Sequence, residues 1–183
     1  LHLIHTLSLH DALPIFYSDD GGSTWQMGSP VGVGMDENKV VELSNGNVML
    51  NSRPSDSSGY RKVSISTDGG VTYSVPKSET QLPDPKDNGA ITRMYPDAAE
   101  GSADAKILLF TNANSQTSRI NGTARYSCDD GTTWSSGRVF QAGAMSYSTI
   151  TALGNDKFGI FYEGVNNTLT FAMVDSAWLG VSC

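Results

Sequence analysis

The sequence predicts an all-β protein built from a repeated antiparallel unit. Three segments share a pattern of Ser, Asp, Gly and Thr followed by an aromatic residue, at residues 18–25, 66–73 and 127–134. Strand-like runs rich in β-branched and aromatic residues recur between them, and Gly, Pro, Asn and Asp separate these runs. No window keeps helical periodicity for more than a turn or two. About ten to twelve strands grouped in fours therefore make about three to four repeated units.

Each copy of the motif follows a strand-like run (IFY, KVSI or ARY) and is expected to close a hairpin turn. The carboxylates of Asp20, Asp68 and Asp129 can accept hydrogen bonds from turn amides, as in Asx turns. Glycine supplies the left-handed backbone, and the aromatic residue folds back against the neighbouring unit. These aspartates are therefore predicted to be structural and not catalytic.

The composition excludes several classes of function. The chain has 183 residues, of which 38% are hydrophobic and 17% are charged, as in a globular domain. Its net charge of −7 argues against binding to nucleic acid or to an anionic membrane. No run of 18 apolar residues occurs that could span a bilayer. The two cysteines, Cys128 and Cys183, can pair or stay reduced, and nothing in the sequence predicts a metal site or a cofactor.

The first fifteen residues differ in character from the rest. They are apolar and contain histidines, but they lack the basic region and the cleavage site of a signal peptide. The run TLSLHDALPI matches the translation of a common sequencing adapter. We therefore interpret residues 1–15 as not native and exclude them from the expected fold, with His5, His10 and Asp11 among them.

The repeated motif resembles the Asp box of sialidases, and several further stretches resemble bacterial sialidases of the secreted actinomycete type. These stretches are DENKVVELSNGNVMLNSR, SGYRKVSISTDGG, KILLFTNANSQTSR, SCDDGTTW and MSYSTITAL. The resemblance covers residues 16–183 and implies the C-terminal part of a catalytic domain. It also implies the fold of that domain, a six-bladed β-propeller, of which about three to four blades are expected here.

The same resemblance implies the residues that carry the chemistry. Sialidases bind the carboxylate of sialic acid with three arginines, and the motifs LNSR and SQTSR place two of them at Arg53 and Arg119. Arginine suits this task because its planar guanidinium binds a carboxylate in a bidentate way. The family uses a tyrosine nucleophile, which maps to Tyr147, since a carboxylate nucleophile would repel the substrate's own carboxylate. Glu37 maps to the base that takes the phenolic proton.

Further polar residues have weaker assignments. Glu163 matches a glutamate that steadies the family's first arginine, whose equivalent is not in this sequence. Asp36 is expected in the pocket wall, and Asn88 is expected on the side that holds the glycerol or N-acyl group. A structural role for the acids is equally compatible with the sequence, because clustered arginines need compensating carboxylates.

Three other arginines are expected to have no part in the site. We interpret Arg61 and Arg93 as members of surface ion pairs. Arg125 lies on a strand that enters an Asp box and is expected to pair outward.

The resemblance implies an extracellular enzyme that acts on sialylated glycoproteins, glycolipids and oligosaccharides. No residue here matches the family's first arginine or its acid/base aspartate, so this chain alone is expected to be inactive. A trans-sialidase would share every residue named above. The alternatives are a non-catalytic Asp-box propeller that binds ligands and an Asp-box glycosidase with paired carboxylates. A glycosidase with paired carboxylates predicts Asp or Glu in place of Tyr147. A binding module has no need of the complete set of Glu37, Arg53, Arg119 and Tyr147.

Overall fold

The computed structural model describes residues 3–6 and 15–183, which form four antiparallel sheets in chain order. The first contains β1 (Leu3–Thr6), β2 (Ile15–Ser18) and β3 (Gln26–Met27), and the second contains β4 (Met35–Glu42), β5 (Val48–Pro54), β6 (Tyr60–Ser66) and β7 (Lys77–Pro83). The third contains β8 (Ala90–Arg93), β9 (Leu108–Ala113), β10 (Ile120–Ser127) and β11 (Arg138–Ala144). The fourth contains β12 (Ser148–Gly154), β13 (Lys157–Glu163) and β14 (Leu169–Asp175), and the short helix α1 (Ser176–Leu179) follows it.

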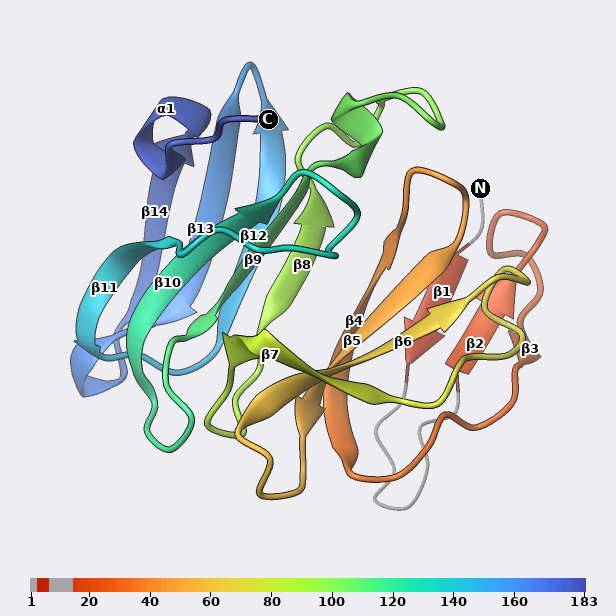
Figure 1. Cartoon of the computed structure of the whole chain (residues 1–183), viewed down its shortest axis with the longest axis horizontal. Coiled ribbons are helices and arrows are strands. Elements are labelled where there is room, and N and C mark those ends of the chain that lie inside the picture. The colour runs from red at the N-terminus through yellow and green to blue at the C-terminus, as the bar shows by residue number, and fades with distance from the viewer. Residues whose placement is uncertain (1–2, 7–14) are drawn as a thin grey trace.

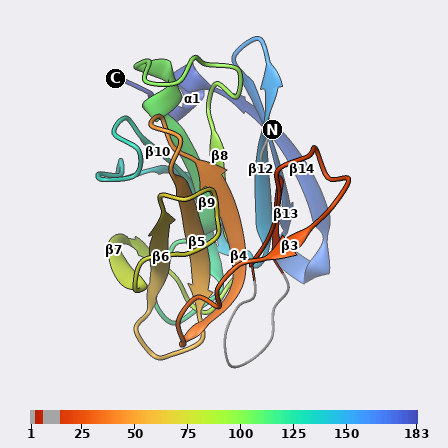
Figure 2. The same ribbon diagram turned by 90° about the vertical axis from the view of Figure 1, so that its right-hand side faces the viewer.

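The sheets follow one another as the blades of a propeller do (Figure 1). Their first strands contact each other in sequence, β1 with β4, β4 with β8 and β8 with β12. In the turned view the second sheet (orange) and the fourth sheet (blue) stand on opposite sides (Figure 2). The prediction of an all-β, partial propeller is confirmed, and the sheets do not close into a ring. No helix among the described residues is long and apolar enough to cross a membrane.

Each hydrophobic core lies between two successive sheets. Ile15 of the first sheet packs with Met35 and Leu50 of the second. The second and third sheets share a core of Val41, Leu43, Met49, Leu82, Ile91, Leu108 and Phe110. The largest core joins the third and fourth sheets through Leu109, Ala124, Ile150, Phe158 and Ile160, with six further buried residues. Face-to-face burial between sheets therefore holds the fold together.

The three Asp boxes form the predicted hairpin turns. They connect β2 to β3 in the first sheet, β6 to β7 in the second and β10 to β11 in the third. In the second box, Asp68 Oδ1 accepts the backbone N–H of Thr72 at 2.9 Å, and Oδ2 accepts the Thr72 hydroxyl at 2.6 Å. Asp20 and Asp129 make the same two bonds to Thr24 and Thr133. These carboxylates hold the turns closed, as predicted.

The aromatic residues of the second and third boxes pack against the preceding sheet. Tyr73 joins the core between the first and second sheets, and Trp134 packs edge-on against Phe110 at 5.8 Å between ring centroids. Trp25 in the first box is 44% exposed. In the second and third boxes the aromatic residue therefore closes an interface between two sheets.

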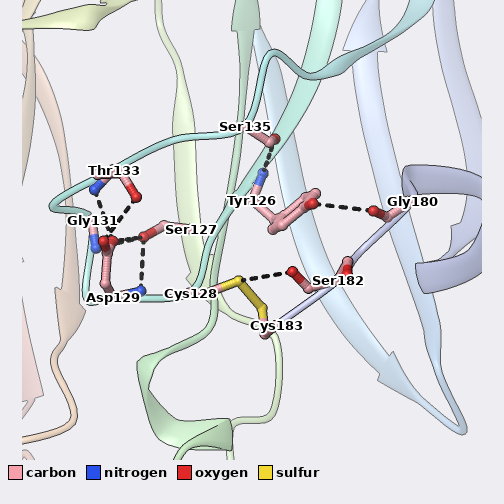
Figure 3. Close-up of a disulfide and its surroundings, with 10 residues drawn as sticks. All are labelled: Tyr126, Ser127, Cys128, Asp129, Gly131, Thr133, Ser135, Gly180, Ser182 and Cys183. Carbon is pink, nitrogen blue, oxygen red and sulfur yellow. Dashed lines mark hydrogen bonds between the residues drawn. A yellow bond between two sulfur atoms is a disulfide. The ribbon is translucent and has the colours of Figure 1, made fainter.

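A disulfide between Cys128 and Cys183 settles the pairing that the sequence left open. Cys128 lies inside the third Asp box, so the bond ties the C-terminal tail to the third sheet (Figure 3). The Tyr126 hydroxyl adds a hydrogen bond to the carbonyl of Gly180 at 3.1 Å. The third and fourth sheets are therefore joined covalently at their Asp-box end.

The segment interpreted as not native is only partly described. Leu3–Thr6 form β1, which pairs antiparallel with β2 from Leu3 opposite Ser18 to Thr6 opposite Ile15. These four residues thus take part in the first sheet, contrary to their expected exclusion from the fold. His10 and Asp11 lie outside the described residues. The origin of residues 1–15 stays a prediction.

Removing the disulfide should lower the stability of the chain. The bond closes a loop of 55 residues, and a crosslink of this span stabilises a protein by about 2–4 kcal/mol by restricting the unfolded chain. We expect Cys128→Ser to lower the free energy of unfolding by that amount in urea denaturation. The unmodified chain in reducing buffer is the matched control and should behave like the variant. An unchanged free energy in both would contradict a structural role.

The Asp boxes should stay ionised in mild acid. Hydrogen bonds from the Thr24 and Thr72 hydroxyls and amides lower the pKa of Asp20 and of Asp68 to about 2. Because both pKa values lie below the ordinary 3.8, these bonds stabilise the fold above about pH 4, and that contribution is lost as the pH falls towards 2. NMR titration of the side-chain carboxyl groups should give midpoints near pH 2 for Asp20 and Asp68. Thr72→Val should move the Asp68 midpoint upward and leave that of Asp20 in place.

Candidate active site

The predicted site residues gather at one end of the sheets, opposite the Asp boxes. Glu37 lies near the start of β4 and Arg53 near the end of β5, which runs antiparallel to β4. Arg119 directly precedes β10 and Tyr147 directly precedes β12. Each Asp box instead follows the end of β2, β6 or β10. The antiparallel order therefore separates the structural turns from the candidate site.

Tyr147, Glu37 and Arg53 form a closed triangle of hydrogen bonds. The Tyr147 hydroxyl donates to Glu37 Oε1 at 2.5 Å. Arg53 Nη1 donates to Glu37 Oε2 at 2.9 Å and to the Tyr147 hydroxyl at 3.0 Å. Residues of the second and fourth sheets, 110 and 94 positions apart, thus meet at one phenolic oxygen. This arrangement places a carboxylate where it can take the proton of the phenol.

A β-bulge aims Glu37 at the phenol. The register between β4 and β5 shifts between the pairs Met35–Pro54 and Asn38–Ser52. Such an irregularity redirects the side chains within it, and Asp36 and Glu37 are the residues within this one. Asp36 is close enough to Arg53 to act on it electrostatically. The bulge therefore brings two acidic residues to the same arginine.

The charge of Glu37 raises the pKa values of both Tyr147 and Arg53. Burial raises the pKa of Tyr147, and the hydrogen bond and negative charge of Glu37 raise it further, against the opposing effect of Arg53 and Arg119. Burial acts to lower the pKa of Arg53, but the hydrogen bond and charge of Glu37 outweigh burial and raise it. The phenol is therefore protonated near neutral pH, and it needs the adjacent carboxylate to become a nucleophile.

Arg119, directly before β10 in the third sheet, contacts the ring of Tyr147. Its guanidinium carbon lies 5.3 Å from the centroid of the Tyr147 ring. Nη1 donates to the hydroxyl of Ser146 at 3.1 Å, and Nη2 donates to the backbone carbonyl of Lys86 at 3.0 Å. Its Nε lies 3.6 Å from Asp87 Oδ1. The two predicted arginines thus both contact Tyr147, Arg53 at its hydroxyl and Arg119 over its ring.

Glu163 and Asn88 lie beside Tyr147 in a pocket of about 170 Å³. Glu163 Oε2 accepts the backbone N–H of Tyr147 at 3.4 Å. The side-chain oxygen of Asn88 is buried and has no hydrogen-bond partner within the described part of the chain. The other lining residues are Ser148, Thr149, Phe161, Tyr162 and Leu169. The pocket therefore adjoins the phenol, and the Asn88 oxygen is buried in its wall.

Two arginine assignments from the sequence are wrong. Arg61 is fully buried rather than at the surface, and it binds Asp84 Oδ2 at 3.1 Å and the backbone carbonyl of Asp87 at 2.8 Å. Arg125 does not pair outward. It is buried against Asn112 and Asn114, and burial lowers its pKa to about 10.

The cause of both errors is tertiary. Arg61 is covered by the loop before the third sheet and by Phe110. Arg125 instead bonds to Asn112 and Asn114, on and just after the neighbouring strand β9. A strand pattern does not show either set of contacts. For Arg93 the expected ion pair is confirmed, with Glu42 at 3.8 Å.

Sequence reasoning missed two residues of this region, Asp87 and Ser146. Asp87 precedes the predicted Asn88, and Ser146 precedes the predicted Tyr147. Both contact the guanidinium of Arg119. Their positions next to predicted site residues were the only signal available, because neither belongs to a motif with a chemical role of its own.

A larger pocket of about 350 Å³ lies at the opposite end, between the segment after β8 and the turn from β12 to β13. Two of its three charged residues are engaged within the protein, since Asp156 accepts the Ser176 hydroxyl and Lys157 pairs with Asp175. In residues 3–6 and 15–183, no group of three or more His, Cys, Asp or Glu side chains could hold a metal ion. The chemistry of the described residues therefore concentrates around Tyr147.

A family model described as BNR repeat-like domain matches residues 2–160. This chain belongs to that family. The chain is also 58% identical over 167 residues to the sialidase of Micromonospora viridifaciens. The aligned part covers 91% of this chain and 26% of that protein. The predicted resemblance to bacterial sialidases of the actinomycete type is confirmed.

Solved structures of sialidases share the fold of this BNR repeat-like domain. The Hadza microbial sialidase Hz136 matches with a TM-score of 0.85 and 25% identity, over 97% of this chain and 36% of that one. The intramolecular trans-sialidase from Ruminococcus gnavus, solved with oseltamivir carboxylate, matches with a TM-score of 0.79 and 23% identity, over 100% of this chain and 42% of that one. This chain thus spans less than half the length of each of these relatives.

Breaking the buried pair of Arg61 and Asp84 should destabilise the fold. Arg61→Met leaves the fully buried Asp84 without its cation, which typically costs about 3–5 kcal/mol. Urea denaturation should show a loss of that size. The double variant Arg61→Met/Asp84→Asn removes the unpaired charge and should recover part of it. A single variant within about 0.5 kcal/mol of the parent would refute this role.

Proposed function

We propose that this chain is part of a retaining exo-α-sialidase in which Tyr147 is the nucleophile and Glu37 is its base. One observation carries this function, the closed triangle in which the Tyr147 phenol donates to Glu37 and accepts from Arg53. A binding module has no need of a phenol hydrogen-bonded to a base. The identity to the Micromonospora sialidase supports the same function.

In the proposed reaction the phenolic oxygen of Tyr147 attacks the anomeric carbon of a terminal sialic acid. Its proton passes to Glu37, the bond to the leaving group breaks, and a tyrosyl-glycosyl intermediate forms, which water resolves. Arg53 and Arg119 bind the carboxylate of the sugar, because guanidinium groups pair with carboxylates over two hydrogen bonds. Asn88 lines the pocket beside the phenol, on the side that would hold the glycerol or N-acyl group of the sugar.

The natural substrates under this proposal are sialylated glycoproteins, glycolipids and oligosaccharides outside the cell. The disulfide supports an extracellular location, because such bonds form and persist in oxidising compartments. The chain on its own is expected not to hydrolyse sialosides whose leaving group must be protonated. No residue here matches the family's acid/base aspartate, which would supply that proton.

A substrate whose leaving group needs no proton tests the nucleophile in this chain directly. A 3-fluorosialosyl fluoride releases fluoride unprotonated, and its ring fluorine slows hydrolysis of the intermediate. We expect mass spectrometry of peptides to find the sugar attached to Tyr147. Glu37→Gln should slow labelling by about 10²–10⁴-fold, since it removes the base.

Tyr147→Phe should abolish labelling, whereas Tyr95→Phe, at a tyrosine outside this end of the sheets, should label as the parent does. Labelling elsewhere, or equal labelling of Tyr147→Phe, would show that the nucleophile is wrongly assigned. Turnover of an alkyl sialoside by the unmodified chain would contradict the expected need for a further acid.

A further inference from the structure

Asp87 is a buried carboxylate at the base of Arg119, in the loop between β7 and β8. Its side chain is 0% exposed. Oδ1 lies 3.6 Å from Arg119 Nε, and it accepts the hydroxyl of Ser146 at 3.3 Å and the backbone N–H of Asn88 at 3.0 Å. Oδ2 is buried and has no hydrogen-bond partner in the described part of the chain. A carboxylate in such surroundings is costly to keep, which suggests a function for it.

We propose that Asp87 is the positioning residue of Arg119: it fixes the guanidinium beside Tyr147 so that one N–H of each Nη atom remains available to a ligand carboxylate. This inference rests on the proposed function for the identity of the ligand, a sialate. The placement of Arg119 by Asp87 is independent of that identity.

The donor count of Arg119 supports this role. A guanidinium has five N–H groups. In this structure Nε faces Asp87, one N–H of Nη1 is bonded to Ser146, and one N–H of Nη2 is bonded to the carbonyl of Lys86. One N–H of each Nη atom is left over, and the side chain is 44% exposed. Two N–H groups on adjacent nitrogens match the two oxygens of a carboxylate.

The loop that carries Asp87 is held rigidly. Lys86 has a φ of 64°, a left-handed conformation that is strained for a residue with a side chain. The Asp87 N–H donates to Asp84 Oδ1 at 2.8 Å, and the Asp87 carbonyl accepts from Arg61 Nη1 at 2.8 Å. The surrounding bonds therefore maintain a backbone that turns one carbonyl and one carboxylate towards Arg119.

The charge of Asp87 changes close to neutral pH. Burial raises its pKa to about 6, with a smaller push from Asp84, while Arg119, the Asn88 N–H and Ser146 act in the opposite direction. Arg61 faces the backbone carbonyl of Asp87 from β6, and the ring of Tyr147 lies against Arg119. Above about pH 6 the ionised Asp87 pairs with Arg119, and below it that ion pair is lost.

The raised pKa has a cost in stability. The folded chain binds the Asp87 proton more tightly than the unfolded chain, in which the pKa of this carboxyl has its ordinary value of 3.8. Stability from this group is therefore present below about pH 4 and is lost as the pH rises through about 6. At neutral pH the fold keeps Asp87 ionised against this cost, as expected of a residue retained for a site rather than for packing.

NMR of the ligand-free chain tests the placement of Arg119. Its Nε–H resonance should titrate with a midpoint near pH 6. Asp87→Asn, which keeps the shape and the hydrogen bonds but not the charge, should abolish the titration. Asp56→Asn, which removes an exposed ion pair with Lys62, is the matched control and should leave the titration unchanged. An Nε–H resonance that titrates in the same way in Asp87→Asn would overturn the proposal.

Binding of N-acetylneuraminate, followed by NMR at pH 5 and pH 7.5, tests the consequence for a ligand. The sugar's carboxyl stays ionised over this range. We expect the parent to bind about fivefold more tightly at pH 7.5, the equivalent of about 1 kcal/mol for one accessible charge pair. Asp87→Asn should bind at both pH values as the parent does at pH 5.

The two experiments separate two kinds of failure. If the parent binds no sialate at either pH while its Arg119 resonance still follows Asp87, the positioning role stands and the proposed function fails. If Asp87→Asn keeps the parent's affinity and its pH dependence, the positioning role fails whatever the ligand. A variant that fails to fold would leave the titration of the unmodified chain to decide, because the midpoint near pH 6 is expected there alone.

Discussion

Each of the first three sheets of this chain depends on the next sheet to cover it. The second and third sheets show this most plainly, because nearly all residues of β5 and all six residues of β9 are buried. A four-stranded antiparallel sheet on its own cannot keep both faces of a central strand from water. The sheets therefore stack face to face, and each core draws residues from two of them. The same stacking brings the strand ends of three sheets together, so the site and the cores arise from one constraint.

The polar residues at those strand ends follow a second rule. Arg53 pairs with Glu37, Arg61 with Asp84, and Arg119 with Asp87. Clustered guanidinium groups would repel one another, and a carboxylate beside each removes most of that repulsion. The carboxylates are therefore more than counterions, since each also sets the direction in which its arginine faces. The affinity of such a site for an anion depends on both partners of every pair.

Local patterns predicted much of this structure. The Asp boxes could be predicted because the side-chain hydrogen bonds of Asp20, Asp68 and Asp129 join residues within four positions of each other. Glu37, Arg53, Arg119 and Tyr147 were found through their resemblance to known sequences, and the structure brings them together.

Burial and long-range pairing could not be predicted in the same way. Arg61 and Arg125 were misassigned because the polar partners that bind each of them lie at least ten positions away in the chain. The bond between Cys128 and Cys183 spans 55 positions, and Asp87 acquires its role only through Arg119, 32 positions later. These features depend on how one sheet lies on the next, which no local pattern contains.

Two ties between sheets lie at opposite ends of the molecule. The disulfide joins the third and fourth sheets at the Asp-box end, whereas the hydrogen bonds of Tyr147 reach across from the fourth sheet at the site end. If the disulfide opened, the core between the third and fourth sheets and the hydrogen bond from Tyr126 to Gly180 would still hold them together. Only the last residues, beyond Gly180, would be released. Reduction would therefore loosen the C-terminal tail and leave the geometry around Tyr147 unchanged.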